Sequence, residues 1–321
     1  MVSVLHLWVA VLLMCVGSAG LAQVYPHKPL RLIVPFAPGG SNDIMARIIG
    51  HKFSESLGQQ VIIDNRGGAS GIIGTDIAAK AAPDGYTLLM MSLTLTVNPS
   101  LYKKLPYDTV KDLAPVSLVA SAPLILVVHP SLPVKSLKEF IAHAKAHPGK
   151  FNFGSGGPGT TPHLAGEMLK SMAGLQMTHV PYKGGGPALA DLIGGQLQLM
   201  LENIPSTLPF VKSGKLRVLA LSGLKRSALV ADVPTLDEAG LKGYEIVGWN
   251  GLFLPAATPT AIVSRLHAET VKALALPDIR ERLSGMGAEG VGNSPPQFST
   301  FVKSEIKKWA QVARDAGLRV E

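Results

Sequence analysis

The chain has 321 residues, which is long enough for two domains of ordinary size. Hydrophobic residues make up 47% of it and charged residues 16%, a balance that predicts large, well-covered cores and excludes a disordered chain. The formal net charge of +8 favours anions near the surface. No cluster of Lys and Arg with interleaved aromatic residues occurs, so nucleic acid is not an expected partner.

Residues 1–22 have the pattern of a signal peptide. The apolar run LWVAVLLMCV (7–16) is too short to span a bilayer, and the small residues of GSAGLA precede a predicted cut after Ala22. No Lys or Arg precedes the apolar run, and a buried N-terminal helix is the alternative. Removal of Cys15 with this segment would leave neither a disulfide nor a thiolate metal site. A soluble protein exported to the periplasm is therefore expected.

Residues 30–58 predict a strand, a glycine turn and a helix. LRLIV is a short buried-strand run, Ser41 is a candidate N-cap, and Gly58 ends the helix. The same order recurs after residue 61, and again in the segment 150–195. The spacing between successive glycine pairs is the same in both halves, which indicates two similar lobes.

The alternation of strands and helices predicts an α/β fold with mostly parallel sheets covered on both faces. Lobe 1 would comprise 23–122 plus 247–321, and lobe 2 would comprise 123–246. The chain would cross between the lobes twice, near 121–134 and again before 247–255. Two crossings make a hinge with a cleft between the lobes, and the C-terminal helices are expected to pack on lobe 1.

The stretch FNFGSGGPGTTPH (151–163) carries Gly154, Gly156 and Gly159 in the GxGxxG spacing of dinucleotide sites. Such a site needs an acidic residue about 20 positions further on, at the end of the next strand. Here that strand ends in HVPY (179–182), and export would remove the protein from the cytosolic nicotinamide pool. No cofactor is therefore expected.

Glycine turns at strand ends can bind an anion without a nucleotide, because main-chain N–H groups and the positive end of a helix dipole point at the ligand. The chain has four such turns, at 38–41, 66–71, 154–161 and 183–187. We expect the first and third to face each other across the cleft and to hold a small carboxylate. The alternative is that these are ordinary strand-to-helix turns in which glycine only permits tight geometry.

Most of the candidate ligand-binding residues lie in and beside these turns, and Ser92 and Asn203 lie outside them. They are Phe36, Ala37, Gly39, Gly40, Ser41, Asp43, Ser92, Ser155, Gly156, Thr160, Thr161, His163, Tyr182, Lys183, Gly184 and Asn203. The serine and threonine hydroxyls among them are either ligand donors or helix caps. The broader contact ranges we expect are 36–41 and 155–163 for the carboxylate, with 92–98, 182–184 and Asn203 for the rest of the ligand.

Four of these side chains have a specific alternative role. His163 either donates to the ligand or is a structural histidine, and Asp43 either caps its helix or accepts a ligand amine or hydroxyl. Phe36 and Tyr182 are either walls of the pocket or core aromatic residues.

Catalytic and metal patterns are weak. No GxSxG elbow occurs, and HAKAH (143–147) lacks the glutamate of HExxH, so a solvated helix face is expected there and no metal. Ser100 and Lys103 fit the SxxK pattern of penicillin-binding enzymes, but so do several other pairs. No catalytic residue is expected. The alternative is an exported α/β enzyme, similar to a serine hydrolase or transpeptidase, that depends on Ser100 or Ser155.

Several motifs together resemble the Bug (TctC-like) solute-binding proteins of tripartite tricarboxylate transporters. They are YPHKPLRLIVPFAPGGSND, IIDNRGGASGIIG, APDGYTLLM, NFGSGGPGTTPHLAGE, HVPYKGGGPALADLIGGQ and GWNGLFLPAATPT. The resemblance implies a two-lobed periplasmic binding protein of type II, in which the loops matching 36–41 and 154–161 pinch a carboxylate, partly through ordered water.

The resemblance also implies delivery of the ligand to a membrane permease with one large and one small subunit, and a monomeric receptor is expected. A receptor that hands its closed form to a signalling sensor is a third alternative. The chain departs from the usual pattern at DNRGG (64–68), where the family has Glu-Asn-x-Pro-Gly, and at Gln198, where it has an acidic residue.

Overall fold

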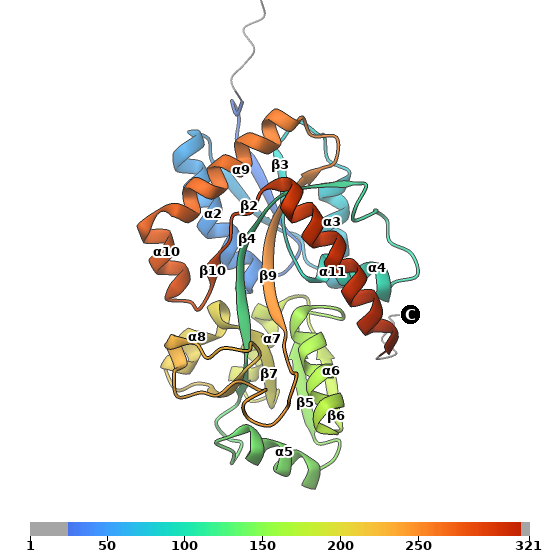
Figure 1. The fold of residues 1–321 in the computed structure, drawn as a ribbon, viewed down its shortest axis with the longest axis vertical. Helices are drawn as coiled ribbons and strands as arrows, with labels where there is room; N and C mark the ends of the chain where they lie inside the picture. The colour runs from blue at the N-terminus through green and yellow to red at the C-terminus, as the bar shows by residue number, and fades with distance from the viewer. Residues whose placement is uncertain (1–24, 316–321) are drawn as a thin grey trace, which may run out of the picture.

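The computed structural model describes residues 25–315, which form two lobes stacked along the long axis of the molecule (Figure 1). The predicted signal peptide at 1–22 lies outside the described residues. Among residues 25–315, no helix combines the length and the apolar character that a bilayer crossing needs.

The upper lobe in Figure 1 is built from the first and last thirds of the chain. Its elements are β1 (Leu30–Val34), α2 (Ser41–Leu57), β2 (Val61–Asn65), η1 (Ala69–Gly71), α3 (Ile72–Ala79), β3 (Thr87–Ser92), α4 (Thr94–Leu101), the first part of β4 (Leu113–Val128), β9 (Val247–Pro255), α9 (Thr260–Ala275), α10 (Pro277–Ser284), β10 (Glu289–Gly290) and α11 (Pro295–Asp315). Helix α9 packs on α2, and α11 packs on α4 and β4, so the C-terminal helices lie on this lobe as expected.

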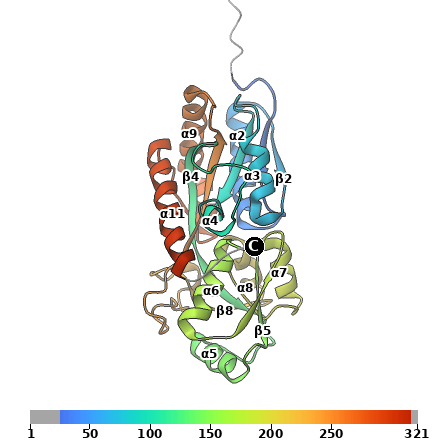
Figure 2. The same ribbon diagram turned by 90° about the vertical axis from the view of Figure 1, so that its right-hand side faces the viewer.

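The lower lobe is built from the middle of the chain. Its elements are the end of β4, α5 (Leu137–Ala146), β5 (Phe151–Ser155), α6 (Thr161–Ala173), β6 (Met177–Pro181), α7 (Gly185–Ile193), β7 (Leu199–Asn203), α8 (Ile204–Lys212), β8 (Arg217–Leu221) and η2 (Ala228–Val230). Figure 2 shows α5 at the end of this lobe that lies farthest from the upper one.

Both sheets begin with parallel strands and end on antiparallel ones. Strand β1 pairs in parallel with β2 and β3, and β5 pairs in parallel with β6 and β7. Strand β9 then runs antiparallel to β3, and β7 and β8 run antiparallel to β4. The predicted α/β fold is confirmed, whereas the expectation of mostly parallel sheets is wrong, because β4 and β9 run antiparallel to the strands with which they pair. The carboxyl ends of the parallel strands in both lobes point toward the space between them.

Strand β4 belongs to both sheets. Its residues 113–123 pair with β9, whereas residues 124–128 pair with β7 and β8. The last pairs along β9 are Ala122 with Gly248 and Pro123 with Val247, so the two crossing segments lie side by side. This pairing supports our proposal that the lobes divide at 122/123 and at 246/247.

The local signals explain where the main helices begin and end. Helix α2 ends at Gly58 and α6 ends at Gly174, both left-handed, with φ of 68° and 62°, a conformation that glycine adopts without strain. The prediction that Ser41 caps α2 is wrong, because the N-cap position is Gly40 and Ser41 is the first helical residue. Its hydroxyl donates instead to Asn250 of β9, a partner that lies far away in the sequence.

Candidate ligand-binding site

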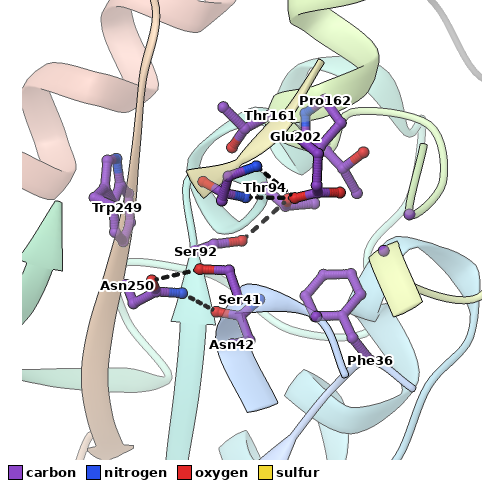
Figure 3. Close-up of a pocket in the computed structure, with 15 residues that line it drawn as sticks. Phe36, Ser41, Asn42, Ser92, Thr94, Thr161, Pro162, Glu202, Trp249 and Asn250 are labelled. Carbon is purple, nitrogen blue, oxygen red and sulfur yellow. Dashed lines mark hydrogen bonds between the residues drawn. The ribbon is translucent and has the colours of Figure 1, made fainter. Parts of the chain in front are cut away.

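A small pocket lies between the two lobes, at the carboxyl ends of the parallel strands (Figure 3). It is lined by Phe36, Gly40, Ser41, Asn42, Ser92, Thr94, Gly156, Thr160, Thr161, Pro162, Gly185, Glu202, Asn203, Trp249 and Asn250. Its volume is about 40 Å³, which is room for about three water molecules. The lobes are therefore nearly closed in this structure.

The upper wall of the pocket is the start of α2. Asn250 bridges the first two residues of this helix, because its Oδ1 accepts from the Ser41 hydroxyl at 3.1 Å and its Nδ2 donates to Asn42 Oδ1 at 2.5 Å. Within the described part of the chain, no side chain caps α2, so its first-turn N–H groups lack the acceptor that a cap would supply. The hydroxyls of Ser92 and Thr94 are hydrogen-bonded to each other at 3.4 Å, so one of the two can donate to a ligand.

The lower wall is the start of α6, built in the same way. Thr160 occupies the N-cap position, one of the two roles considered for it, but its hydroxyl donates to the Gly157 carbonyl at 2.7 Å and not to the helix. Across the described residues no side chain accepts from the first turn of α6, whose Thr161 and Pro162 line the pocket. Two uncapped helix starts, one from each lobe, thus meet at one cavity, and both favour negative charge there.

The lobes touch directly beside the pocket. The Ala37 N–H donates to the Lys183 carbonyl at 3.1 Å, and a Cβ atom built on Gly40 would lie 3.6 Å from the nitrogen of Gly185. The turn at 36–40 is therefore in direct contact with the turn at 183–186. The turn at 154–161 meets it only across the pocket.

Eight of the predicted residues line the pocket and eight do not. The eight that line it are Phe36, Gly40, Ser41, Ser92, Gly156, Thr160, Thr161 and Asn203. The other eight are Ala37, Gly39, Asp43, Ser155, His163, Tyr182, Lys183 and Gly184. Among these, Ala37, Lys183 and Gly184 form the contact between the lobes, since a Cβ atom on Gly184 would lie 2.9 Å from Ala37 nitrogen.

Asp43 is buried within lobe 1 rather than in the pocket. Its carboxylate accepts from the Gly39 N–H at 3.0 Å, from the Arg47 guanidinium at 3.0 Å and from Asn65 Nδ2 at 3.0 Å. Burial raises the pKa of Asp43, but these hydrogen bonds and the charge of Arg47 outweigh it, so the pKa is lowered overall. The carboxylate shapes the turn before α2, which is neither of the two roles weighed from the sequence, a helix cap or a ligand contact.

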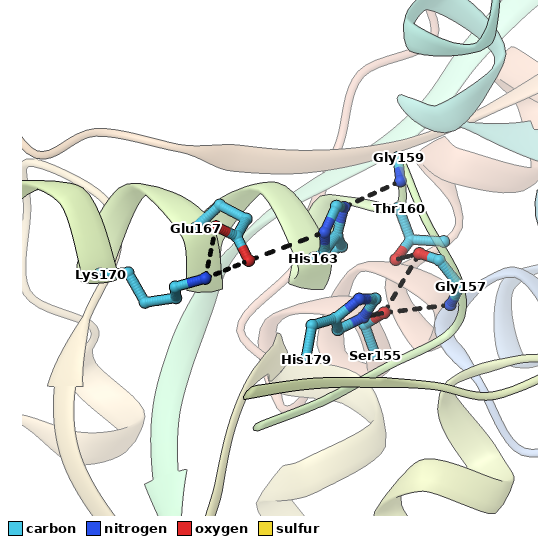
Figure 4. Close-up of polar contacts among 8 residues, drawn as sticks. All are labelled: Ser155, Gly157, Gly159, Thr160, His163, Glu167, Lys170 and His179. Carbon is cyan, nitrogen blue, oxygen red and sulfur yellow. Dashed lines mark hydrogen bonds and ion pairs between the residues drawn. The ribbon is translucent and has the colours of Figure 1, made fainter. Parts of the chain in front are cut away.

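Ser155, His163 and His179 form a cluster behind the lower wall (Figure 4). Ser155 is fully buried, and its Oγ lies 2.6 Å from His179 Nε2 and 3.1 Å from the nitrogen of Gly157. His163 Nδ1 accepts from the Gly159 N–H at 3.0 Å, and the two imidazole rings are 4.1 Å apart. These contacts hold the turn at 154–160 in shape, so the side chains support the pocket without lining it.

Both histidines of this cluster are neutral at ordinary pH. Burial, together with the nearby His163 and Lys170, lowers the pKa of His179 to about 3. Burial also lowers the pKa of His163, although the Glu167 carboxylate acts in the opposite direction. Protonating either ring would place an imidazolium inside the lobe, which burial disfavours.

Tyr182 is also turned away from the pocket. Its hydroxyl donates to Asp191 Oδ2 at 2.6 Å, and burial together with this carboxylate raises the pKa of Tyr182 to about 12. The side chain therefore fastens the end of β6 to α7.

Five lining residues were absent from the ranges expected from the sequence: Asn42, Gly185, Glu202, Trp249 and Asn250. Asn42 and Gly185 are direct neighbours of predicted residues. Trp249 and Asn250 lie in the GWNG segment that carried the family resemblance, which was the available signal for them. Glu202 sits in an apolar strand and has no sequence signal of its own.

Glu202 is the one ionisable side chain among the described residues that line the pocket. It is 2% exposed, and its Oε1 accepts from the main-chain N–H and the side-chain Nδ2 of Asn203, both at 2.8 Å. Its Oε2 has no hydrogen-bond partner anywhere in residues 25–315. Burial raises the pKa of Glu202, and this outweighs the lowering by the hydrogen bonds from Asn203 and by the nearby Ser206 hydroxyl.

The fold and the pocket together define a class, the two-lobed α/β receptors that take a small solute between their lobes. Residues 45–318 match the model of the tripartite tricarboxylate transporter family receptor, TctC. The chain belongs to this family of periplasmic solute-binding receptors. The resemblance inferred from the motifs is confirmed.

Similar proteins cover almost the whole chain. Protein BugT of Bordetella pertussis (strain Tohama I) is 39% identical over 319 residues, which are 97% of this chain and 98% of that relative. A solved structure of the periplasmic binding protein BugD has a TM-score of 0.90 at 35% identity, covering 92% of this chain and 100% of the other. Rpa4515 of R. palustris with adipate has a TM-score of 0.90 at 37% identity, with the same coverage.

Proposed function

We propose that this protein is a periplasmic receptor that captures a small carboxylate between its lobes and delivers it to a tripartite tricarboxylate-type transporter. One observation carries the proposal: the uncapped starts of α2 and α6, from opposite lobes, converge on one pocket. Among the described lining residues there is no Lys, Arg or His, so the anion would be held by main-chain N–H groups and hydroxyls. The adipate in Rpa4515 supports a carboxylate ligand.

The energies are sufficient for such a clamp. A hydrogen bond to a charged group contributes about 1.5–3 kcal/mol, and a helix N-terminus adds about 0.3–1 kcal/mol. Two or three such bonds from each lobe reach the ~8 kcal/mol that corresponds to micromolar affinity. The proposed contacts are the eight predicted residues that line the pocket, with Asn42, Asn250 and the N–H groups of the first turns of α2 and α6.

The partners and the location follow from the same proposal. The receptor would act as a monomer, be exported through the signal peptide at 1–22 with cleavage after Ala22, and dock on a membrane permease with one large and one small subunit. The family match and the likeness to BugD support the periplasmic location and the transport role. Intact mass of the protein recovered from periplasm should begin at Gln23, and a mass that retains Cys15 would contradict the cleavage.

The protein would bind its ligand without turning it over. Ser155 does approach a histidine, but its side chain is fully buried behind the pocket, and burial keeps the pKa of that histidine far below neutrality. A substrate cannot reach Ser155 Oγ without dismantling the turn that this hydroxyl holds. The geometry therefore favours a receptor over an enzyme that depends on Ser155.

The test is a thermal-shift and calorimetric screen of the purified protein against adipate, succinate, malate, citrate, glutamate and benzoate. A binder at 100 times its Kd stabilises the folded state by about 2.7 kcal/mol, which is a clear rise in Tm. Trp249 lines the pocket, so its fluorescence should change with the same ligand. If every acid left Tm and fluorescence unchanged, or if the bound acid were consumed, the proposal would be wrong.

A further inference from the structure

Glu202 poses a problem for a receptor that binds anions. An ionised carboxylate buried beside a ligand carboxylate would repel it, and no charged side chain compensates. Every other described lining residue, from α2, β3, α4, the turn before α6, α7 and β9, is uncharged. On β4, the residue paired with Glu202 is Ile125, and the charge of Asp43 is paired with Arg47.

Ionised Glu202 would also be costly before any ligand arrives. The side chain is 2% exposed and takes part in no ion pair among residues 25–315. A buried carboxyl without a cation takes up a proton rather than remain charged. Gly185 leaves space next to the unpartnered oxygen, since a Cβ atom there would lie 2.7 Å from Glu202 Oε2.

We propose that Glu202 is a ligand-binding residue that works in its protonated form, donating the hydrogen of Oε2 to an oxygen of the bound anion. Oε1 remains the acceptor for Asn203, so the carboxyl group is held at one oxygen and free to donate at the other. A protonated carboxyl supplies a strong donor without adding a positive charge. The proposal rests on the carboxylate-binding function proposed above and names one side chain that would donate to the bound ligand.

Capture would then be linked to pH. Below the pKa of Glu202 in the free receptor, the anion binds a ready-made donor. Above it, binding must also take up one proton, so the Kd rises by up to tenfold for each pH unit. His163 and His179 do not contribute to the pH dependence of binding above pH 6.5, because burial lowers the pKa of both and they are neutral there.

The first test needs no ligand. A carboxyl whose pKa is higher in the folded than in the unfolded chain binds more protons when folded, so its contribution to stability falls as the pH rises above its ordinary pKa of 4.5. Between about pH 5 and about pH 9, the Tm of the wild type should fall relative to that of Glu202→Gln. Parallel Tm curves for the two proteins would show that Glu202 is ionised when folded and would overturn the proposal.

The second test measures the Kd of adipate, succinate, malate, citrate, glutamate and benzoate between about pH 6 and about pH 9. The affinity of the wild type should fall with rising pH. The affinity of Glu202→Gln should not depend on pH in this way, because its amide donates at every pH. Glu202→Met has no donor and should bind at least tenfold more weakly than Glu202→Gln. Glu167→Gln, a change on α6 outside the pocket, is the control and should keep the wild-type pH profile.

The outcomes separate this inference from the function on which it rests. A pH-independent wild type, or a Glu202→Gln protein as weak as Glu202→Met, would overturn the role of the proton while leaving carboxylate capture in place. Failure of every acid to bind the wild type would instead overturn the proposed function. The Tm comparison would still decide whether Glu202 carries a proton.

Discussion

Gly40 lies where the two lobes meet beside the pocket, so the size of the side chain at this position should control ligand binding. A Cβ atom there would lie 3.6 Å from Gly185 nitrogen and 3.8 Å from Gly186 nitrogen, which is ordinary contact distance. Its backbone angles, φ −84° and ψ 171°, suit any residue. Alanine should therefore fit, whereas the two γ-methyl groups of valine must enter the pocket or push the lobes apart.

We predict that Gly40→Val weakens ligand binding at least tenfold while leaving Tm without ligand within a few degrees of the wild type. Gly40→Ala should retain most of the affinity and serves as the matched control. Isothermal titration with the tightest acid of the screen measures both. Equal affinities for the valine variant and the wild type would refute the pinch between the lobes.

Asp43 holds the turn before α2, and replacing it tests how much this turn contributes to stability. We predict that Asp43→Asn lowers the free energy of unfolding by about 1–3 kcal/mol, because the amide cannot accept from Gly39, Arg47 and Asn65 together. The pKa of Asp43 is lower in the folded chain than its ordinary 3.8, so its stabilising contribution is complete above that pH and is lost as the pH falls below it.

Urea unfolding of Asp43→Asn and wild type at pH 7 and near pH 3 checks this prediction. The difference between them should shrink at the lower pH. The exposed Asp232→Asn should show no comparable change. A constant difference at both pH values would mean that the charge of Asp43 is not what stabilises the turn.

At the scale of elements, several helix starts meet at the pocket, among them those of α2, α6 and α7. The first turn of α7 approaches the loop of the opposite lobe so closely that a Cβ atom on Gly186 would overlap the Pro38 carbonyl oxygen. Because alanine is otherwise favourable inside a helix, this position separates closure of the lobes from stability of the helix.

We predict that Gly186→Ala holds the lobes apart and weakens binding at least tenfold without lowering Tm in the absence of ligand. Gly194→Ala, at the other end of α7, meets only the carbonyl groups of its own helix and should bind normally. Calorimetric titration of both variants is the measurement. Wild-type affinity in Gly186→Ala would show that closure does not bring these two turns together.

At the scale of the whole molecule, the pocket is too small to hold the proposed carboxylate ligand. Sites for small molecules have volumes of about 300–1,000 Å³, against about 40 Å³ here, so the lobes must separate for a ligand to enter. The two adjacent crossings, in β4 and before β9, are where this motion would pivot.

We predict that small-angle X-ray scattering of the ligand-free protein gives a larger radius of gyration than the structure, and that the tightest acid of the screen reduces it. The forward scattering should correspond to the mass of a monomer. Identical profiles with and without ligand, at saturating concentration, would contradict hinge closure.

Much of the fold could be read from the chain because its signals are local. Apolar runs, glycine turns and helix ends recur at regular intervals, and each is decided by residues close together in sequence. Gly58 ends its helix as predicted, Gly174 ends α6 in the same way, and glycine turns at the strand ends line the pocket. Six of the eight predicted lining residues lie in or beside those turns, and Ser92 and Asn203 are the other two.

What the tertiary structure decided is which side chains share the pocket. Asn250 and Glu202 come from β9 and β7, far from the glycine turns in sequence, and only sheet pairing and lobe closure bring them there. Ser155, His163 and Tyr182 stand beside the right turns, yet each bonds within its own lobe. The direction of a side chain depends on contacts between segments distant in the chain, which no local pattern contains.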